Sequence, residues 1–486
     1  MNTQMLLPLS LMSSMALPMM AQNVNTENQK PDVLFLFVDD MTYNGLNELG
    51  TSDVISPNLD KLIQSGVSFQ NCYNMGGWNG AISTASRSQM MTGMYLWNTH
   101  HEMTTDKYRT LSKNQMLWPQ VMKNAGYKTF HTGKWHMSHI RPENIYDEAI
   151  AVRPGMPKTV ESAYNRPLSR DDNNWLPWDQ QHGGYWENGK HWSEILADLT
   201  IDYMKQNQDS KEPLFICCAF NAPHDPRQSP KEFIDMYDVD KIKLPESFLP
   251  QHPYMDEMNC GQNLRDERLV PWPRTKYAIQ KHRLEYYALI THLDVQIGRI
   301  LDQLKKSGRE KNTLIVFAAD NGLSLGNHGL VGKQSMYDHS MKIPLAFAGL
   351  NMPKGQKRSQ LVYLQDLVPT IYDIIGVNTP DNVQFVSQLD VVKKGSAKAK
   401  RNSVYGAYLD KQRMVRKGDY KLFFIISSGR AMLFDLKHDP NEMNDLFGKS
   451  EKYNKIAKDL AAEYAKLAKE AGDKLDIQSK FPALFQ

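Results

Sequence analysis

The sequence predicts an α/β fold with a large mixed, mostly parallel sheet sandwiched by helices. Three continuous apolar runs are rich in β-branched and aromatic residues, as is typical of strands buried on both faces: 33–38, 214–220 and 313–319. Helical patterns lie between these runs, at 58–66, 115–126 and 191–206. Strands that alternate with helices indicate a mostly parallel sheet with helices on both faces. In such folds, ligands bind at the carboxyl ends of the strands.

A second, smaller subdomain is expected towards the end of the chain. Beyond about Gly376 the apolar runs are short and alternating, at 414–415, 420–424 and 432–434. Apolar residues then recur at helical spacing, at Tyr453, Ile456, Leu460, Tyr464 and Leu467. We therefore expect an α/β domain with the active site over 22–376, and an antiparallel sheet plus a helix over 377–486. The stretch 137–189 has no clear period and predicts a long folded surface excursion near the site.

The first residues of the chain have the composition of a targeting segment. Residues 5–20 are largely apolar, Ala21 precedes a polar stretch, and the run is too short to span a bilayer. No lysine or arginine precedes the run, and no cysteine follows it as a lipoprotein anchor would require. We predict a secretory signal peptide over 1–21 and an exported protein, periplasmic or extracellular. No later segment is expected to span a membrane.

Composition excludes several classes of function. A formal net charge of +3 over 486 residues is too small to argue for a nucleic acid or an anionic membrane surface as partner. Four cysteines are too few for a disulfide scaffold, and none shows the C-x-x-C spacing of a zinc site.

Two pairs of oxygen-bearing residues directly follow predicted strands. Asp39-Asp40 follows the first strand, and Asp320-Asn321 follows the third. Carboxylate and amide oxygens suit calcium or magnesium better than zinc or copper. Adjacent aspartates would repel each other, and a divalent cation removes that cost. An aspartate that caps a turn is the alternative for either pair alone, but two pairs at strand ends favour a metal site.

A candidate nucleophile lies between these pairs in the sequence. In the run 83–87, Ser-Thr-Ala-Ser-Arg, Ser83 precedes Arg87 by four residues, just ahead of a helical stretch. A serine with these neighbours arises easily by chance. Its place among metal ligands and cations points to chemistry on a sulfate or phosphate ester.

Four further residues could bind an oxyanion or transfer protons. Lys134 and His136 alternate on an extended segment, so their side chains should point the same way. His224 lies between two prolines in a loop after the second strand, and Lys333 follows Asp320 by thirteen residues. A surface lysine or an ordinary turn histidine explains each residue equally well when it is taken alone.

The ordered set of motifs resembles the type I sulfatases of the alkaline phosphatase superfamily, in the serine form of bacterial carbohydrate sulfatases. The motifs that carry the resemblance are Asp39-Asp40, Pro57 to Asp60, Ser83 to Arg87 with Thr92-Gly93, Gly126 to His136, Pro223-His224, Asp320 to Gly322, Gly332-Lys333, 416–422 and 433–440. They follow the family's order over nearly the whole mature chain. The resemblance implies an alkaline phosphatase-like fold.

The resemblance also implies a cofactor set and a role for each residue. Ser83 would be oxidised to formylglycine by a radical-based sulfatase-maturing enzyme, and one calcium ion would be held by Asp39, Asp40, Asp320 and Asn321. Arg87 would brace the formylglycine, and Lys134 and Lys333 would bind sulfate oxygens. Lys333 or His224 would assist the departing alkoxide, and His136 would take a proton so that sulfate is released. Alanine at position 85 replaces the commoner proline, a minor departure.

The substrate is expected to be a sulfated carbohydrate, with galactose or N-acetylgalactosamine as the first choice. Polar side chains near the motifs could bind sugar hydroxyls, although each of them could equally serve only to order a loop: Asp225, Arg227, His328 and His339. A phosphate- or phosphonate-ester hydrolase of the same superfamily is the nearest alternative. An exported glycan-binding protein without catalysis is another, but no expected ligand or cation is missing.

Overall fold

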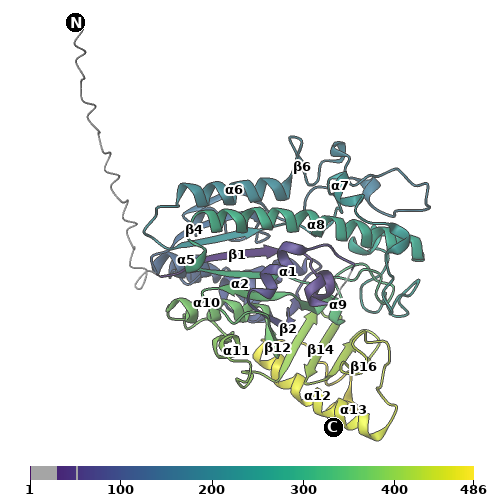
Figure 1. Ribbon diagram of the computed structural model, residues 1–486. Coiled ribbons are helices and arrows are strands. Elements are labelled where there is room, and N and C mark those ends of the chain that lie inside the picture. Colours follow the sequence, from purple (N-terminus) through teal and green to yellow (C-terminus); the bar gives the residue numbers. More distant parts are fainter. Residues whose placement is uncertain (2–29, 51–52) are drawn as a thin grey trace. The chain divides into compact units, whose positions relative to one another are not determined.

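A mixed sheet of nine strands forms the centre of the computed structural model, which describes Met1, residues 30–50 and residues 53–486 (Figure 1). The strand order is β10-β2-β11-β9-β1-β8-β4-β5, with β12 beside β2. The strands are β1 (Asp32–Val38), β2 (Val67–Tyr73), β4 (Lys128–Lys134), β5 (Glu148–Arg153), β8 (Leu214–Ala219), β9 (Thr313–Ala319), β10 (Lys342–Ile343), β11 (Leu345–Gly349) and β12 (Gln356–Tyr363). The predicted signal peptide lies outside the described residues, apart from Met1.

The three predicted strands are neighbours at the centre of this sheet. β1 pairs in parallel with β9 on one side and with β8 on the other, so that Phe35 lies opposite both Val316 and Cys217. All seven residues of β1 are buried, which explains why residues 33–38 are continuously apolar. β4 and β5 extend the parallel part, whereas β11 pairs antiparallel with β9 and β2. The prediction of a mixed, mostly parallel sheet is confirmed.

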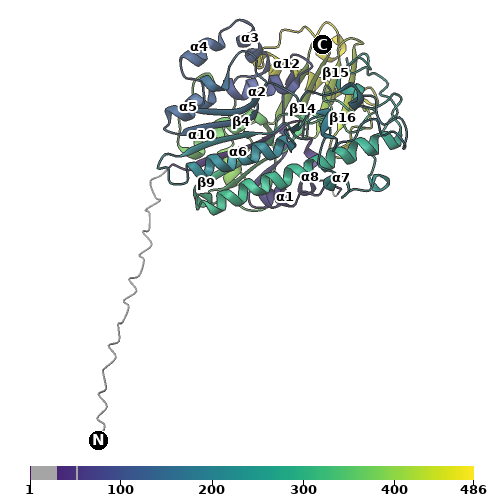
Figure 2. The ribbon, with the colours of Figure 1, turned by 90° about the horizontal axis from the view of Figure 1, so that it is seen from above.

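Helices cover both faces of the sheet. The main helices are α1 (Pro57–Gln64), α2 (Ile82–Thr92), α3 (Leu96–Thr104), α4 (Tyr108–Lys113), α5 (Trp118–Asn124), α6 (Trp192–Gln206), α8 (Lys276–Lys306) and α10 (Leu367–Ile375). Short helices are α7 (Lys231–Ile234), α9 (Asp338–Met341) and α11 (Leu389–Lys393). α6 and α8 pack together on one face and α10 lies on the other (Figures 1 and 2). α1, α5 and α6 confirm the three predicted helices.

The longest helix, α8, has no counterpart among the predicted helices. It runs for 31 residues, and most of its central stretch is buried, including Tyr286 to Asp294 without interruption. A helix buried on several sides lacks the single apolar stripe by which a surface helix is recognised. None of the helices in the described part of the chain is long and apolar enough to cross a membrane.

A smaller sheet of five strands follows in the C-terminal part, in the order β16-β15-β14-β13-β3. Its strands are β13 (Ser403–Tyr408), β14 (Gln412–Lys417), β15 (Tyr420–Ile425) and β16 (Arg430–Asp435), with α12 (Glu451–Glu470) packed against them and α13 (Pro482–Phe485) after it. The predicted antiparallel sheet and helix are therefore present. The fifth strand, β3 (Gly76–Gly77), comes from the N-terminal part and pairs in parallel with β13. The boundary between 376 and 377 stays a prediction.

The segment 137–189 is more ordered than its composition indicated. β5 belongs to it and pairs with β4 at the edge of the main sheet, and β6 (Trp186–Glu187) forms a hairpin with β7 (Lys190–His191). β5 is only partly buried along its length, so its sequence lacks a continuous apolar run. The four cysteines are buried free thiols, and Cys217 and Cys218 lie in β8 as expected.

Candidate active site

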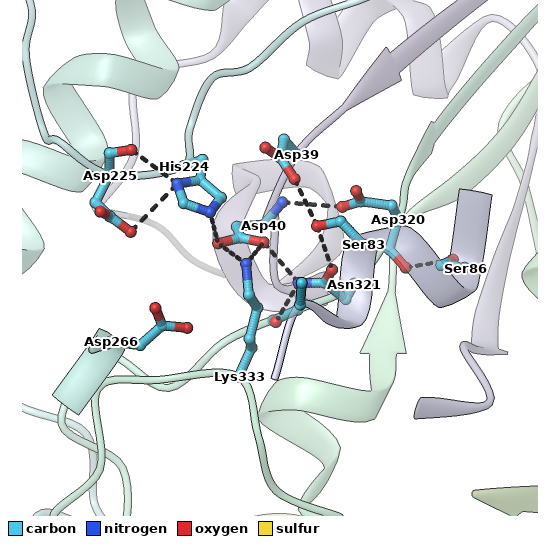
Figure 3. A network of polar contacts seen from close by, with 12 residues as sticks. Asp39, Asp40, Ser83, Ser86, His224, Asp225, Asp266, Asp320, Asn321 and Lys333 are labelled. Carbon is cyan, nitrogen blue, oxygen red and sulfur yellow. Dashed lines mark hydrogen bonds and ion pairs between the residues drawn. The ribbon is translucent and has the colours of Figure 1, made fainter. Parts of the chain in front are cut away.

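The carboxyl ends of β1 and β9 bring the two predicted metal-ligand pairs together. Val38 lies opposite Ala319, so the residues that follow both strands meet at one edge of the sheet. The Asp40 amide donates to Asp320 Oδ1 at 3.2 Å, and Asn321 Nδ2 donates to Asp40 Oδ1 at 2.7 Å (Figure 3). All four side chains are buried.

Backbone geometry at this edge is unusual in two places. Asp40 has φ of 61° and His136 has φ of 60°, in the left-handed region that residues other than glycine rarely adopt. Such conformations concentrate at functional sites, where the surrounding structure holds them in place. Gly133 allows β4 to approach β8, because a Cβ on it would lie 1.9 Å from the carbonyl oxygen of Ala219. Lys134 is the next residue after Gly133 and the last residue of β4.

Ser83 lies in the first turn of α2 and points into the ligand cluster. Its Oγ is 3.1 Å from Asp39 Oδ1 and 3.2 Å from Asn321 Oδ1 (Figure 3). The ammonium of Lys134 donates to Ser83 Oγ at 3.2 Å and also to Asp39 Oδ2. The positive end of the α2 dipole therefore faces a position that is suited to an anion.

Arg87 braces this turn from one helical turn further along α2. Its Nε donates to Asp320 Oδ2 at 3.0 Å and its Nη1 to the Lys134 carbonyl at 2.9 Å. The guanidinium also lies over the Phe37 ring, 4.5 Å from the centroid. Arg87 thus ties α2 to the ends of three strands and fixes where Ser83 stands.

Lys333 and His224 approach the cluster from the side of Asp40. Lys333 Nζ donates to both carboxylate oxygens of Asp40, at 2.8 and 2.9 Å, and His224 Nε2 lies 3.4 Å from Asp40 Oδ2 (Figure 3). Burial alone would lower the pKa of Lys333, but the carboxylates of Asp40 and Asp266 outweigh it and raise that pKa. Burial lowers the pKa of His224 to about 4, against the attraction of Asp40.

His136 lies at the edge of this group and is only partly buried. Burial, followed by the charge of Lys134, keeps the pKa of His136 below its ordinary value, so its ring is neutral. Its Nδ1 is buried without a hydrogen-bond partner among the described residues. Gly155 leaves room beside the ring, because a Cβ there would lie 3.3 Å from His136 Cδ2.

The donor set fits a hard divalent cation. Asp39, Asp40 and Asp320 each offer a carboxylate oxygen, and these oxygens lie within 4.8 Å of one another. Burial, followed by the charge of Asp320, raises the pKa of Asp39 to about 8. Each of these carboxylates pairs with one basic side chain, yet their oxygens still face one another, and oxygen ligands are those that calcium and magnesium prefer.

The four predicted sugar-binding residues are dispersed, and their roles stay predictions. Asp225 lies beside the cluster, with Oδ1 3.2 Å from His224 Nδ1. Arg227 is buried, donates to the Pro223 carbonyl and lies over the Tyr286 ring. His328 and His339 line a separate polar cavity of about 260 Å³, which none of the predicted catalytic or metal-binding residues lines.

Sequence motifs did not indicate Arg265, which lies beside this cluster. Its Nη2 donates to Asp225 Oδ1 at 3.0 Å in a two-pronged ion pair, and its side chain is 32% exposed. The sequence around Arg265 carries no motif, and the residue reaches the site only through the loop before α8. The position of Arg265 beside Asp225 could therefore not be predicted from the sequence.

Comparison with known proteins identifies the family. A model of the family described as Sulfatase matches residues 31–377. The chain belongs to the sulfatase family. A second model, described as N-sulphoglucosamine sulphohydrolase, C-terminal, matches residues 326–470. The resemblance drawn from the motifs is confirmed, and this sulfatase is a sulfuric ester hydrolase.

Two curated relatives cover nearly the whole chain. An N-acetylglucosamine-6-O-sulfatase from Bacteroides thetaiotaomicron is 25% identical, over 99% of this chain and 93% of its own length. An arylsulfatase from Clostridium perfringens is 28% identical, over 88% of this chain and 92% of its own length.

Solved structures share the fold. A protein in complex with its substrate D-glucosamine-2-N,6-O-disulfate has a TM-score of 0.70 at 21% identity, over 92% of this chain and 99% of its own. A phosphonate monoester hydrolase from Silicibacter pomeroyi has a TM-score of 0.69 at 21% identity, over 93% of this chain and 97% of its own. The alkaline phosphatase-like fold is thereby confirmed.

Proposed function

We propose that this sulfatase is an exported enzyme that removes a sulfate ester from a glycan, with a formylglycine made from Ser83 and one calcium ion. The observation that carries the proposal is the position of Ser83 Oγ. It lies 3.1 to 3.2 Å from Asp39 Oδ1, Asn321 Oδ1 and Lys134 Nζ. An attacking oxygen at this point would be next to both the metal ligands and a cation that can hold the sulfate.

Formylglycine would supply a hydrated aldehyde, and one of its hydroxyls would attack the sulfur of the ester while its proton passes to Asp39, whose Oδ1 lies 3.1 Å from Ser83 Oγ. A radical-based maturing enzyme would have to oxidise Ser83 first, because an unmodified serine lacks the second hydroxyl. Arg87 would hold this residue in the first turn of α2 through its bonds to Asp320 and to the Lys134 carbonyl. The buried position of Ser83 excludes bulk water from the attack.

The surrounding side chains would bind the sulfate and move protons. Lys134 and Lys333 would bind sulfate oxygens and offset the charge that develops on them. As the bond between sulfur and the sugar oxygen breaks, His224 or Lys333 would give a proton to that oxygen. His136 would then take a proton from the remaining hydroxyl, so that sulfate leaves and the aldehyde returns.

Asp39, Asp40, Asp320 and Asn321 would hold the calcium ion. Bound there, the ion would supply a Lewis acid that polarises the sulfate and orients the ester. The convergence of three buried carboxylates supports this assignment.

A sulfated carbohydrate is the proposed substrate class. Relatives whose names state a carbohydrate substrate support it: the N-acetylglucosamine-6-O-sulfatase and an ulvan-active sulfatase from Formosa agariphila. Sulfated galactose and N-acetylgalactosamine are the first sugars to test, with 6-O-sulfated N-acetylglucosamine beside them. The apolar residues 5–20 support export of the enzyme.

A panel experiment tests the proposal directly. Protein co-produced with a serine-type maturing enzyme is incubated with sulfated mono- and disaccharides, and released sulfate is measured. Conversion of Ser83 is checked by peptide mass. Release of sulfate from at least one sugar is expected, and its absence from matured protein would contradict the proposal.

A phosphate- or phosphonate-ester hydrolase is the alternative, since phosphonate monoester hydrolases share this fold. The family match and the sulfatase relatives favour sulfate. Matured protein should release sulfate from an aryl sulfate faster than it releases phosphate from the matching aryl phosphate. Faster release of phosphate would support the alternative.

A further inference from the structure

An open groove of about 550 Å³ lies between the N-terminal part and the C-terminal sheet. It is bounded by the loop that leads to Ser83, by α3, by the turn between β13 and β14, and by the segment 472–475 that follows α12. The sulfatase chemistry proposed above uses none of the residues that line it.

One wall of the groove is aromatic. The rings of Trp78 and His100 are stacked, with centroids 5.2 Å apart and an angle of 27° between their planes. Trp97 stands next to His100 and is anchored by a hydrogen bond from its Nε1 to Tyr405 Oη at 2.8 Å. Trp78, Trp97 and His100 are all partly exposed. A held, partly exposed ring is a platform for the C–H face of a sugar ring.

Other residues that line the groove carry side chains that can bind hydroxyl groups. The side chain of Asp410 is 65% exposed, and that of Lys474 is also exposed. Lys474 forms no ion pair with any residue in the part of the chain that the structure describes, so its donors remain free for a ligand. A groove with an aromatic wall and both a carboxylate and an ammonium matches the chemistry of a pyranose ring, with its apolar face and ring of hydroxyls.

One loop connects the groove to the predicted nucleophile, because Trp78 precedes Ser83 by five residues. Trp78 follows β3, which is held against β13 so closely that a Cβ on Gly76 would lie 2.0 Å from the Ala407 carbonyl oxygen. Further along the same loop, the Gly80 carbonyl accepts a hydrogen bond from Gln334 Nε2 at 2.9 Å. Gln334 is the neighbour of Lys333. The loop therefore runs from the groove at Trp78, past Gly80, to Ser83.

We infer that this groove binds the pyranose units that adjoin the sulfated sugar in a glycan chain, so that the enzyme acts on oligosaccharides in preference to single sugars. The inference rests on the proposed function for its substrate class. The groove would be a second binding region for the substrate, and the C-terminal part of the chain contributes Leu409, Asp410, Arg413 and residues 472–475 to its lining.

The test compares a hexasaccharide with a monosaccharide in wild type and in Trp78→Ala. The substrates are sulfated galactan and chondroitin hexasaccharides and the matching sulfated monosaccharides. The ratio of kcat/KM for the hexasaccharide to that for the monosaccharide should fall about tenfold in Trp78→Ala and about threefold in Lys474→Ala. Trp186→Ala is the matched control, since Trp186 is also partly buried but does not line the groove.

Calorimetry with the desulfated hexasaccharides gives a readout that needs no catalysis. Their dissociation constant should rise in Trp78→Ala and in Lys474→Ala, and not in Trp186→Ala. An unchanged ratio and an unchanged dissociation constant in a folded Trp78→Ala protein would overturn the inference. If Trp78→Ala does not fold, the exposed Lys474→Ala decides by the same two measurements.

Failure of the groove and failure of the proposed function give different results. If the wild type cleaves no sulfated sugar but binds the hexasaccharide, and Trp78→Ala loses that binding, the inference about the groove is supported and the proposed function is contradicted. If the enzyme releases sulfate from sugars but shows no preference for hexasaccharides, the proposed function is supported and the inference about the groove is contradicted.

Discussion

Two clusters of opposite charges in this molecule are built differently. At the junction with the C-terminal sheet, Lys421 Nζ lies 2.8 Å from Asp338 Oδ1 and 2.5 Å from Glu442 Oε1. The ammonium thus stands between two carboxylates. In the proposed catalytic cluster, which comprises Asp39, Asp40 and Asp320 with the cations that pair with them, the carboxylate oxygens lie within 4.8 Å of one another.

The cations of the catalytic cluster are distributed one to each carboxylate. Lys134 pairs with Asp39, Lys333 with Asp40 and Arg87 with Asp320. In the junction cluster, one ammonium lies between two carboxylates. In the catalytic cluster, the carboxylate oxygens face one another and each cation pairs with one carboxylate. The first arrangement serves stability and the second is suited to an external ion. Four predictions test this contrast.

The largest effect is expected from Ser83→Ala. Activity should fall by at least about four orders of magnitude because the attacking oxygen is lost. The fold and calcium binding should remain, since Asp39, Asp40, Asp320 and Asn321 are unchanged. Sulfate release, circular dichroism and calcium titration check this. Full residual activity would refute the assignment of the nucleophile.

Removal of calcium should be the next largest effect. Chelation should lower activity about a thousandfold because the metal contributes several kcal/mol to catalysis. Added calcium should restore activity and raise the melting temperature of the wild type, because it binds only the folded protein. Asp40→Asn should lose this calcium-dependent shift, whereas Asp338→Asn at the junction should keep it. An equal calcium response in both variants would remove the distinction between the clusters.

Lys421→Met should destabilise the fold without affecting the response to calcium. Lys421 is fully buried, and its loss leaves Asp338 and Glu442 without their shared cation. We expect the free energy of unfolding to fall by about 3 kcal/mol. Lys205→Met is the control, because Lys205 and Asp202 form an exposed pair that contributes less than about 1 kcal/mol. Chemical denaturation measures both, and equal losses would contradict the prediction.

The smallest effect concerns pH at the junction. Burial raises the pKa of Glu442 to about 7 from an ordinary 4.5, against the attraction of Lys421. The folded protein therefore keeps a proton that the unfolded chain loses above pH 4.5, and this stabilisation is lost as the pH rises through 7. From pH 5 to pH 7, this group should lower the free energy of unfolding by about 2 kcal/mol.

Glu442→Gln isolates that contribution, because glutamine keeps the acceptor for the Asp338 amide but does not titrate. Denaturant unfolding at pH 5, 6 and 7 should show a shallower decline in the variant than in the wild type. Parallel declines would show that Glu442 is not the titrating group.

The sequence determined the central strands and most of the catalytic cluster. A strand buried on both faces must be continuously apolar, so β1, β8 and β9 were evident from composition alone. Polar residues directly after such strands can lie only at the sheet's edge, which is why Asp39 and Asp320 could be placed. The motif around Ser83, together with the motifs that contain Lys134, His136, His224 and Lys333, supplied the remaining predicted residues.

Other features depended on tertiary structure. Arg265 reaches Asp225 from forty residues further along the chain, and His328 lies in another cavity although it is close to Lys333 in sequence. α8 was not predicted because it is buried on several sides. Which polar side chains face one another depends on strand order and loop path, and neither leaves a local pattern.

The contrast between the clusters has the same origin. Asp40 follows a strand and Asp338 begins the short helix α9, and nothing in the adjacent residues distinguishes their roles. The fold places Asp40 against two other carboxylates and Asp338 against Lys421. The sequence by itself determined which charged residues are present. Only the tertiary structure decided which carboxylates face one another and which share one cation, because electrostatic pairing depends on distances between residues that are far apart in the chain.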